Sequence, residues 1–281
     1  MESYRYEFGF LLVFACANLI CPVFVDEFVL GTRGDRAEYF LCVVFGMVLC
    51  ELATVSAWLA MTPGTLVVRV AKASAALVFL AFVMLLGFLV VDEFPIEVVF
   101  VTIGSAFVGT VIFVLPLACY SAQSGRSIRN HFYEYDDSVE PYQFSVRQLL
   151  VLTTFVALMV AIGKVVFPMA ADGGLPWGEV IPFCIFYLLL CGGLIVLNLL
   201  VVFDHKWRPI ALICVAVCIG LMPLAALVFM RILFPSIQYE MRDVFPKVVL
   251  FLVSFCAATD VCFLVGRGLG FHLHSSADPG G

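Results

Sequence analysis

The feature that most constrains this chain is a series of long apolar blocks separated by short polar connections. About 20 consecutive apolar residues are enough for a helix to cross the hydrocarbon core of a bilayer. Lipid cannot hydrogen-bond the backbone, and these runs are too long and too uniformly apolar for barrel strands. The sequence therefore predicts an all-α fold, a polytopic transmembrane helical bundle of about eight helices. The predicted spans are residues 8–25, 37–61, 69–91, 95–120, 148–171, 179–203, 209–234 and 247–266.

Composition agrees with a membrane location and argues against two classes of protein. Of the 281 residues, 63% are hydrophobic and only 13% are charged, whereas a soluble domain carries about 25% charged residues. The formal net charge of −6 argues against a nucleic-acid partner, because no basic stripe is available to neutralise phosphates. The 11 cysteines lie within or beside apolar blocks, which indicates packing residues rather than the disulfide framework of a small secreted protein.

The longest polar segment lies in the middle of the chain and divides it into two halves. The helix that follows it has an entry signature, because Ser145 and Gln148 have the S-x-x-Q spacing of a capping box. The predicted organisation is a first four-helix membrane half over 1–120, a cytoplasmic polar connector over 121–147, a second four-helix half over 148–266 and a flexible C-terminal tail over 267–281.

Matches between the two halves predict a 4+4 internal repeat. The offsets rise along the chain, as a duplication with small insertions would produce. Four spans in each half mean that both halves enter the membrane from the same side, which makes the repeat parallel. Apolar sequences also match by chance, so unrelated halves remain the alternative. Three single-residue matches are offset by 146: Pro22 with Pro168, Asp26 with Asp172 and Pro63 with Pro209. The segment A-A-L-V-F occurs at 75–79 and again at 225–229, an offset of 150. D-E-F-P-I-E-V-V-F at 92–100 matches D-V-F-P-K-V-V-L-F at 243–251, an offset of 151.

Basic residues in the connections predict the orientation, because Lys and Arg concentrate on the cytoplasmic side. Eight spans place the N-terminus, the connector and the C-terminal tail on one side, which holds nine of the Lys and Arg residues, against six on the other. The short loop D-H-K-W-R-P at 204–209 is basic, while V-D-E-F-P-I-E at 91–97 has no basic residue. We therefore expect both termini in the cytoplasm.

Ionisable and polar residues inside a span are costly, so they are the first places to look for function. Glu51 lies near the middle of its predicted span, and it suits a proton carrier, a cation ligand or a counter-charge for a substrate. The alternative is a carboxyl group hydrogen-bonded to a neighbouring helix. Asp260 and Lys164 complete the candidate intramembrane site; Asp260 could instead pair with Arg267, two turns along the helix, and Lys164 could reach the membrane surface.

Other polar residues suit ordinary structural roles. Asn18 and Asn198 are expected to hydrogen-bond between helices, and Gly109 belongs to a small-residue packing notch. His272 and His274 lack a fixed third ligand for a metal. No zinc-protease H-E-x-x-H, hydrolase G-x-S-x-G or nucleotide-binding P-loop pattern is present in the sequence. The sequence thus predicts no catalytic, cofactor-binding or metal-binding residue.

The segment F-S-V-R-Q-L-L-V-L-T-T-F-V-A-L at 144–158 carries the one resemblance to known proteins. It resembles a segment of many uncharacterised bacterial multi-pass membrane proteins, in which F-S-[LIV]-R-x-L-L precedes a span containing T-T-x-x-A. There it opens a helix pair near one terminus, whereas here it lies in mid-chain. The resemblance implies a bacterial inner-membrane location and no particular activity.

These observations predict a non-catalytic integral membrane protein that is a structural, accessory or signalling partner. Its expected partners are the lipid bilayer and a protein bound through the 121–147 connector or a second copy, with no nucleic acid and no cofactor. The alternative is a small secondary transporter using Glu51 and Asp260, and a membrane enzyme ranks third. A transporter requires a polar cavity at mid-membrane, whereas an accessory protein should have a solid core and an ordered or partner-bound segment over 121–148.

Overall fold

The fold is known from a computed structural model, which describes residues 11–20, 35–62, 65–90, 96–130, 177–233 and 241–275. The all-α prediction is confirmed, because helices occupy seven of the predicted spans within these residues. The eighth span, 148–171, lies outside them, as do Ser145, Gln148 and Lys164. The elements are helix Leu11–Ile20, α2 (Asp35–Met61), α3 (Leu66–Val90), α4 (Ile96–Ser124), β1 (Arg126–Asn130), α6 (Trp177–Phe203), α7 (Arg208–Leu233), α8 (Met241–Gly268) and β2 (Phe271–Ser275).

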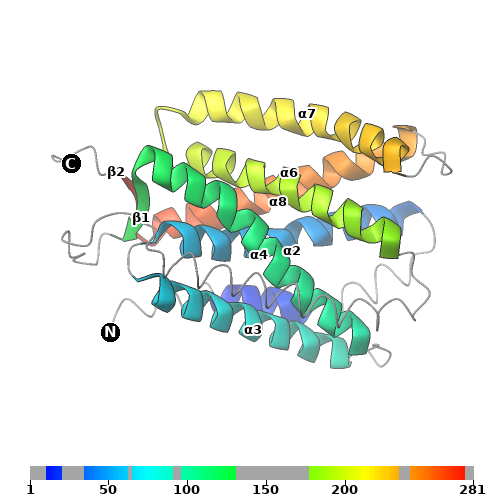
Figure 1. The fold of residues 1–281 in the computed structure, drawn as a ribbon, viewed down its shortest axis with the longest axis horizontal. Coiled ribbons are helices and arrows are strands. Elements are labelled where there is room, and N and C mark those ends of the chain that lie inside the picture. Colours follow the sequence, from blue (N-terminus) through cyan, green and yellow to red (C-terminus); the bar gives the residue numbers. More distant parts are fainter. Residues whose placement is uncertain are drawn as a thin grey trace.

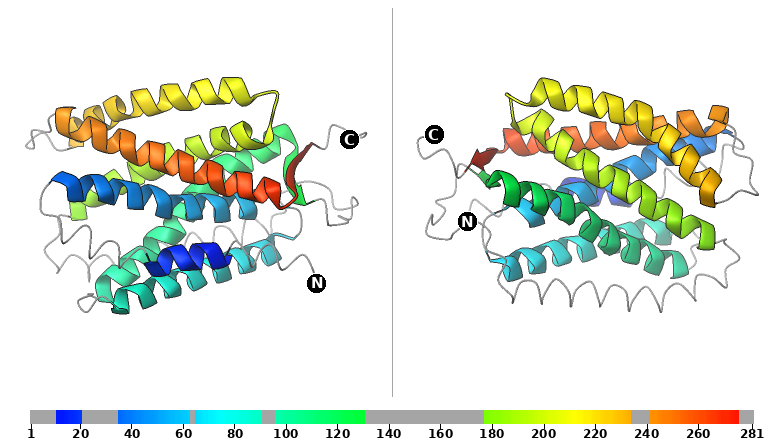
Figure 2. Two further views of the ribbon diagram at one scale, coloured as in Figure 1. Left: turned by 180° about the vertical axis from the view of Figure 1, so that it is seen from behind. Right: turned by 45° about the horizontal axis from the view of Figure 1, so that its top comes forward.

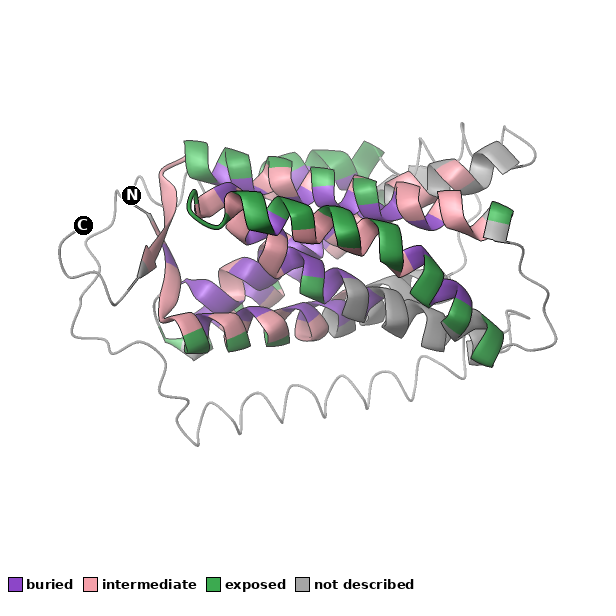
Figure 3. Cartoon of the chain, turned by 90° about the horizontal axis from the view of Figure 1, so that it is seen from above, coloured by how far each residue is buried: buried purple, intermediate pink, exposed green. Residues whose placement is uncertain are grey.

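Three of the described helices are long and apolar enough to cross a membrane: Val67–Leu86, Arg208–Val228 and Val244–Gly268. Large apolar side chains on their outer faces remain exposed, including Val78 of α3 at 56% and Ile213 of α7 at 64%. Figure 3 shows exposed residues along the outside of the bundle and buried ones between the helices. Continuous apolar exposure of this kind is unfavourable in water. The chain is therefore a membrane-embedded protein, with lipid covering these faces.

The helices are arranged as a central ring with one helix added on each side. Helices α2, α4, α6 and α8 form the ring, each packing against the next, while α3 lies against α2 and α4 and α7 lies against α6 and α8 (Figure 1). All four ring helices end at the side of the bundle that carries β1 and β2, where α3 and α7 begin (Figures 1 and 2). We call this side the strand end and the opposite side the far end.

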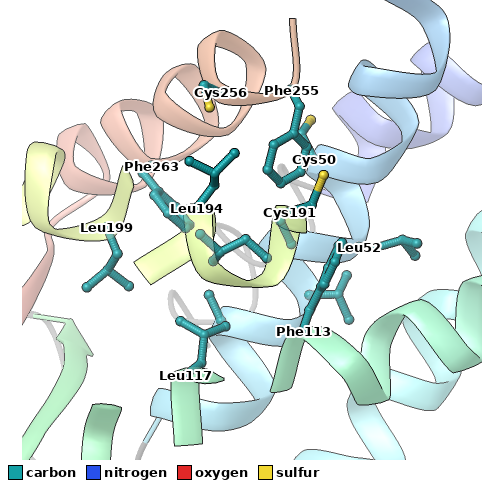
Figure 4. Packing of buried hydrophobic residues seen from close by; sticks show 14 of the residues in the cluster. Cys50, Leu52, Phe113, Leu117, Cys191, Leu194, Leu199, Phe255, Cys256 and Phe263 are labelled. Atoms are coloured by element: carbon teal, nitrogen blue, oxygen red, sulfur yellow. The ribbon is translucent and has the colours of Figure 1, made fainter. Parts of the chain in front are cut away.

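The centre of the ring is filled by apolar side chains. Phe113 from α4 and Phe255 from α8 lie with their ring centroids 6.2 Å apart and are both fully buried. Leu194 of α6 (Figure 4) and Leu252 of α8 are also fully buried in the same cluster. Such interdigitation excludes solvent from the space between the ring helices and holds them by dispersion contacts.

A short antiparallel sheet at the strand end corrects the expectation of a flexible tail over 267–281. β1 pairs with β2 from Arg126 opposite Ser275 to Asn130 opposite Phe271. Gly125 (φ 63°) and Gly270 (φ 88°) have left-handed backbones that glycine adopts readily, and they turn the chain from each helix into its strand. Because α4 and α8 both end here, the two strands meet. Residues 276–281 lie outside the described residues.

Side-chain alternation explains why this tail segment forms a strand. Ile128 of β1 is buried, and Phe271 and Leu273 of β2 pack against the main core. The sequence F-H-L-H alternates apolar and polar residues, which is the strand period. Residues 121–124 of the predicted connector belong to the end of α4, and the sheet fixes residues 126–130 of the connector to the C-terminal segment.

Candidate functional site

Glu51 is buried in the bundle interior and has a specific partner. It lies on α2 with 7% of its surface exposed, and Asn18 of helix Leu11–Ile20 donates a hydrogen bond from Nδ2 to Glu51 Oε2 at 2.8 Å. Asn18 itself is only 3% exposed. The prediction that Asn18 hydrogen-bonds between helices is thus confirmed, and a buried carboxyl group is satisfied by it.

Two cysteine thiols lie beside this carboxyl group. Cys50 Sγ of α2 and Cys262 Sγ of α8 are 3.9 Å apart. Glu51 follows Cys50 in sequence, and its carboxyl group lies near Cys262. We call these four residues, Asn18, Cys50, Glu51 and Cys262, the Glu51 cluster. Because α2 belongs to the first half of the chain and α8 to the second, the cluster lies where the two halves meet.

Asp260 is not part of the Glu51 cluster. It lies two residues before Cys262, which corresponds to about 200° around a helix of 3.6 residues per turn. Since Cys262 faces α2, Asp260 faces away from it, beside the thiol of Cys256 one turn earlier. Its Oδ1 is buried and accepts no hydrogen bond from a described residue. Arg267, the expected partner, instead donates from Nη1 to the Val202 carbonyl oxygen at 2.8 Å.

Asn198 of α6 is a second buried polar group, and its environment could not be read from the sequence. It is completely buried beside Cys256. Its polar neighbour is the Cys256 thiol, and neither the amide nitrogen nor the amide oxygen reaches the geometry of a regular hydrogen bond within the described residues. The expected interhelical hydrogen bond of Asn198 is therefore not found among these residues. The sequence signal was a single amide inside the apolar run L-I-V-L-N-L-L.

The strand end holds a polar cluster that the sequence analysis did not identify. Arg126 of β1 forms an ion pair with Asp204, which follows α6, and Arg126 Nη1 also donates to Tyr120 Oη at 3.0 Å. Asp204 Oδ1 accepts from the backbone N–H groups of Lys206 at 3.0 Å and Trp207 at 3.3 Å. The ion pair therefore ties β1 to the connection between α6 and α7.

Partial burial and the ion pair have opposite effects on the titration of these two groups. Burial alone would raise the pKa of Asp204, but the guanidinium of Arg126 and the backbone N–H donors outweigh it and lower that pKa below its ordinary value. Burial alone would lower the pKa of Arg126, but its hydrogen bonds to Asp204 and Tyr120 outweigh burial and raise that pKa. Both groups are thus charged at neutral pH.

Three more arginines at the strand end cap helix C-termini. Arg69 Nη1 donates to carbonyl oxygens at the end of α2, at 3.0 and 3.1 Å. Arg208 Nε donates to a last-turn carbonyl oxygen of α6 at 2.7 Å, and both Arg208 and Arg267 donate to the Val202 carbonyl oxygen. These donors satisfy carbonyl groups that have no partner within the helix and place positive charge at the negative end of its dipole.

The two histidines of the tail belong to the sheet. His272 lies opposite Arg129 and His274 lies opposite Ser127. A cationic arginine opposite His272 is unfavourable for a bound metal ion. No group of three or more His, Cys, Asp or Glu side chains suited to a metal occurs in the part of the chain that the structure describes.

The exposed apolar helices and the buried polar residues define a helical membrane-embedded protein. Comparisons of the chain with known protein families, with curated proteins and with solved structures gave no match.

Proposed function

We propose that this is a non-catalytic integral membrane protein that acts as an accessory or scaffolding partner in the membrane. The observation that carries this proposal is the filled centre of the ring. Phe113, Phe255, Leu194 and Leu252 come from three helices of both halves and have no exposed surface. A transport pathway between the halves would pass through this position. A packed apolar core is instead what a structural or signalling role requires.

The strand end supports the same role by fixing the start of the polar connector. Residues 126–130 of the connector pair with β2, and Arg126 forms an ion pair with Asp204 in the connection between α6 and α7. The remainder of the connector, 131–147, carries interleaved aromatic and acidic residues. We propose that this segment contacts a protein partner, which is either another membrane protein or a second copy of the chain, at the membrane surface.

We further propose that the bundle has eight spans arranged as a 4+4 parallel repeat. If α2, α3 and α4 are exchanged for α6, α7 and α8, respectively, each packed pair among these helices becomes another packed pair. For example, the α2–α8 pair becomes the α6–α4 pair. The matching A-A-L-V-F segments fall in α3 and α7, which this exchange makes equivalent. First-turn arginines of the same two helices, Arg69 and Arg208, cap the preceding helix in each half; this is a structural likeness only, because the two are 139 residues apart.

Chain connectivity supports the eighth span. β1 lies at the strand end, whereas α6 begins at the far end, so the chain between Asn130 and Trp177 has to run the length of the bundle (Figure 1). α6 alone has 27 residues, which correspond to about 40 Å of helix. A span over 148–171 would make this crossing.

We propose that the strand end faces the cytoplasm of a bacterial cell and that the far end faces the periplasm. Seven of the described Lys and Arg residues lie at the strand end and four at the far end, which is the bias expected of a cytoplasmic side. A cysteine replacing exposed Lys206 should react with a membrane-impermeant maleimide only after the inner membrane is opened. Reaction in intact spheroplasts would reverse the orientation.

Crosslinking in cells tests the accessory role directly. A photoreactive amino acid at Tyr135 in the connector should give discrete protein adducts, because this segment is proposed to contact a partner. The matched control is the same amino acid at Ile213, which is 64% exposed on the lipid-facing side of α7. Equal adduct patterns from the two positions would contradict the proposal.

The second candidate, a proton-coupled transporter, is favoured by one observation, the buried Glu51–Asn18 hydrogen bond. Proteoliposomes that contain a pH-sensitive dye separate the two functions. The accessory role predicts that an imposed pH gradient decays as slowly as in protein-free vesicles, with no change in Glu51→Gln. A faster decay that Glu51→Gln abolishes would establish the transporter instead.

A further inference from the structure

The two thiols of the Glu51 cluster, Cys50 and Cys262, lie close together, and the proposed accessory role does not require this contact. Nine of the 11 cysteines have described side chains, each with a free thiol, and the sulfur atoms of Cys50 and Cys262 lie 3.9 Å apart. They are 212 residues apart in sequence and lie on helices of different halves. A bond between them would join the two halves covalently inside the membrane.

Only a small movement separates this pair from a disulfide. A disulfide has a sulfur–sulfur length of about 2.05 Å, so the two sulfurs must approach by roughly 1.9 Å, or about 0.9 Å each. The backbones of α2 and α8 already lie close together, because Gly46, one turn before Cys50, has no side chain to separate them. A Cβ at Gly46 would lie 2.9 Å from the Phe251 carbonyl oxygen of α8.

The two thiols differ in their access to the lipid. Cys50 is buried, whereas Cys262 is partly exposed on α8, whose outer face carries the exposed side chains of Val261 and Val265. A lipid-soluble molecule can therefore reach Cys262 while Cys50 stays behind it. The carboxyl group of Glu51 lies beside the pair.

We propose that Cys50 and Cys262 are a redox modification site that closes into an intramembrane disulfide, with a membrane-soluble quinone as the oxidant. Two S–H bonds break and one S–S bond forms. The two electrons and two protons that the thiols lose reduce the quinone to a quinol. The disulfide links α2 to α8 and so fixes the two halves of the protein relative to each other. This inference is independent of the accessory role.

The test uses full-length protein in lipid nanodiscs and a fully substituted short-chain benzoquinone, which cannot add thiols at a ring position. After denaturation, free thiols are counted by the gel shift of a polymer-linked maleimide. We expect two of the 11 thiols to be lost, one quinol to form for each protein and dithiothreitol to restore both thiols. Peptide mass spectrometry should show residues 50 and 262 linked.

Single variants supply the controls. Cys50→Ser and Cys262→Ser should each abolish the thiol loss and the quinol formation, whereas Cys191→Ser, which removes a buried thiol elsewhere in the core, should retain both. Diamide serves as a second, smaller oxidant that does not depend on quinone access. Failure of both oxidants to link residues 50 and 262 in folded protein would overturn the site. A disulfide formed by diamide but not by the quinone would overturn the assignment of the oxidant.

Discussion

Replacing Gly46 by alanine tests the tight contact between α2 and α8 on which the arrangement of the two halves depends. A Cβ at this position would lie 2.9 Å from the Phe251 carbonyl oxygen, 2.9 Å from the Phe255 backbone nitrogen and 3.0 Å from the Ser254 Cβ. Two of these atoms belong to the α8 backbone and the third is fixed to it, so no side-chain rotation can relieve the contact. Gly46→Ala therefore has to push α8 away from α2.

The magnitude follows from the distances. Ordinary contact of a Cβ begins near 3.4 Å, so α8 must move by about 0.5 Å, and overpacking of this kind costs about 1–3 kcal/mol. Alanine also has a higher helix propensity than glycine, by about 1 kcal/mol. Gly193 of α6 and Gly220 of α7 provide matched controls, because a Cβ at either position meets nothing within 4 Å. The propensity gain is common to all three variants and cancels in the comparison.

Equilibrium unfolding in mixed detergent micelles measures the difference. Gly193→Ala and Gly220→Ala should be neutral or stabilised, and Gly46→Ala should be less stable than either by about 1–3 kcal/mol. Gly46→Ala should also slow closure of the Cys50–Cys262 disulfide, because it separates the helices that carry the two thiols. A stabilised Gly46→Ala protein, equal to its controls, would refute the close approach of α2 and α8.

Three further predictions concern the buried and ion-paired side chains. Glu51→Leu should lower the free energy of unfolding by about 1–3 kcal/mol, because it leaves the buried amide of Asn18 without its acceptor, whereas Glu51→Gln should change it little; equal losses would show that this hydrogen bond is not the cause. Phe255→Ala should cost about 3–5 kcal/mol in the same assay, and a loss below about 1 kcal/mol would contradict the filled ring. Asp204→Asn should cost less than about 1 kcal/mol at neutral pH, since its pair with Arg126 is partly solvated. Because the folded pKa of Asp204 is depressed below its ordinary 3.8, this contribution is present above pH 3.8 and disappears as the pH falls through the folded pKa; a difference from wild type that persists at the lowest pH would contradict the ion pair.

The positions of the helices were largely predictable, because the length of an apolar block limits where a membrane helix lies. The span predicted over 179–203 is α6 at Trp177–Phe203. The prediction was poorest where a helix extends beyond its apolar block. α8 begins at Met241 rather than at 247, because the polar residues Arg242 and Asp243 lie within its first turn and resemble a loop in composition.

The contacts between helices and strands were not predictable from the same signals. Pairing of Asn130 with Phe271 depends on α4 and α8 ending at the same end of the bundle, and no local property of either segment encodes this. The same reason applies to the candidate site. Glu51 was singled out as a buried carboxyl group, but its partner Asn18 is 33 residues away. Asp260 was grouped with Glu51 on chemical type alone, and its position on α8 directs it to a different face.

The proposed repeat bears on the buried amide of Asn198, which lies beside the Cys256 thiol. Glu51 and Asn198 are 147 residues apart, one position more than the offset of 146 given by the Pro22 and Pro63 matches on either side of Glu51. In the first half Glu51 accepts a hydrogen bond from Asn18, and the residue 146 positions after Asn18 is Lys164. With this one-residue shift, the repeat predicts that substitutions at Lys164 and Asn198 are energetically coupled.

A double-mutant cycle with Lys164→Met and Asn198→Leu measures that interaction, because the coupling energy isolates the pair from the separate effects of each substitution. Hydrogen bonds between membrane helices contribute about 0.6 kcal/mol on average and up to about 1.7 kcal/mol, so the expected coupling lies in this range. The Asn18→Leu and Glu51→Leu cycle in the first half is the reference. Additive losses for Lys164 and Asn198, together with clear coupling for Asn18 and Glu51, would show that the two halves do not share this polar pair.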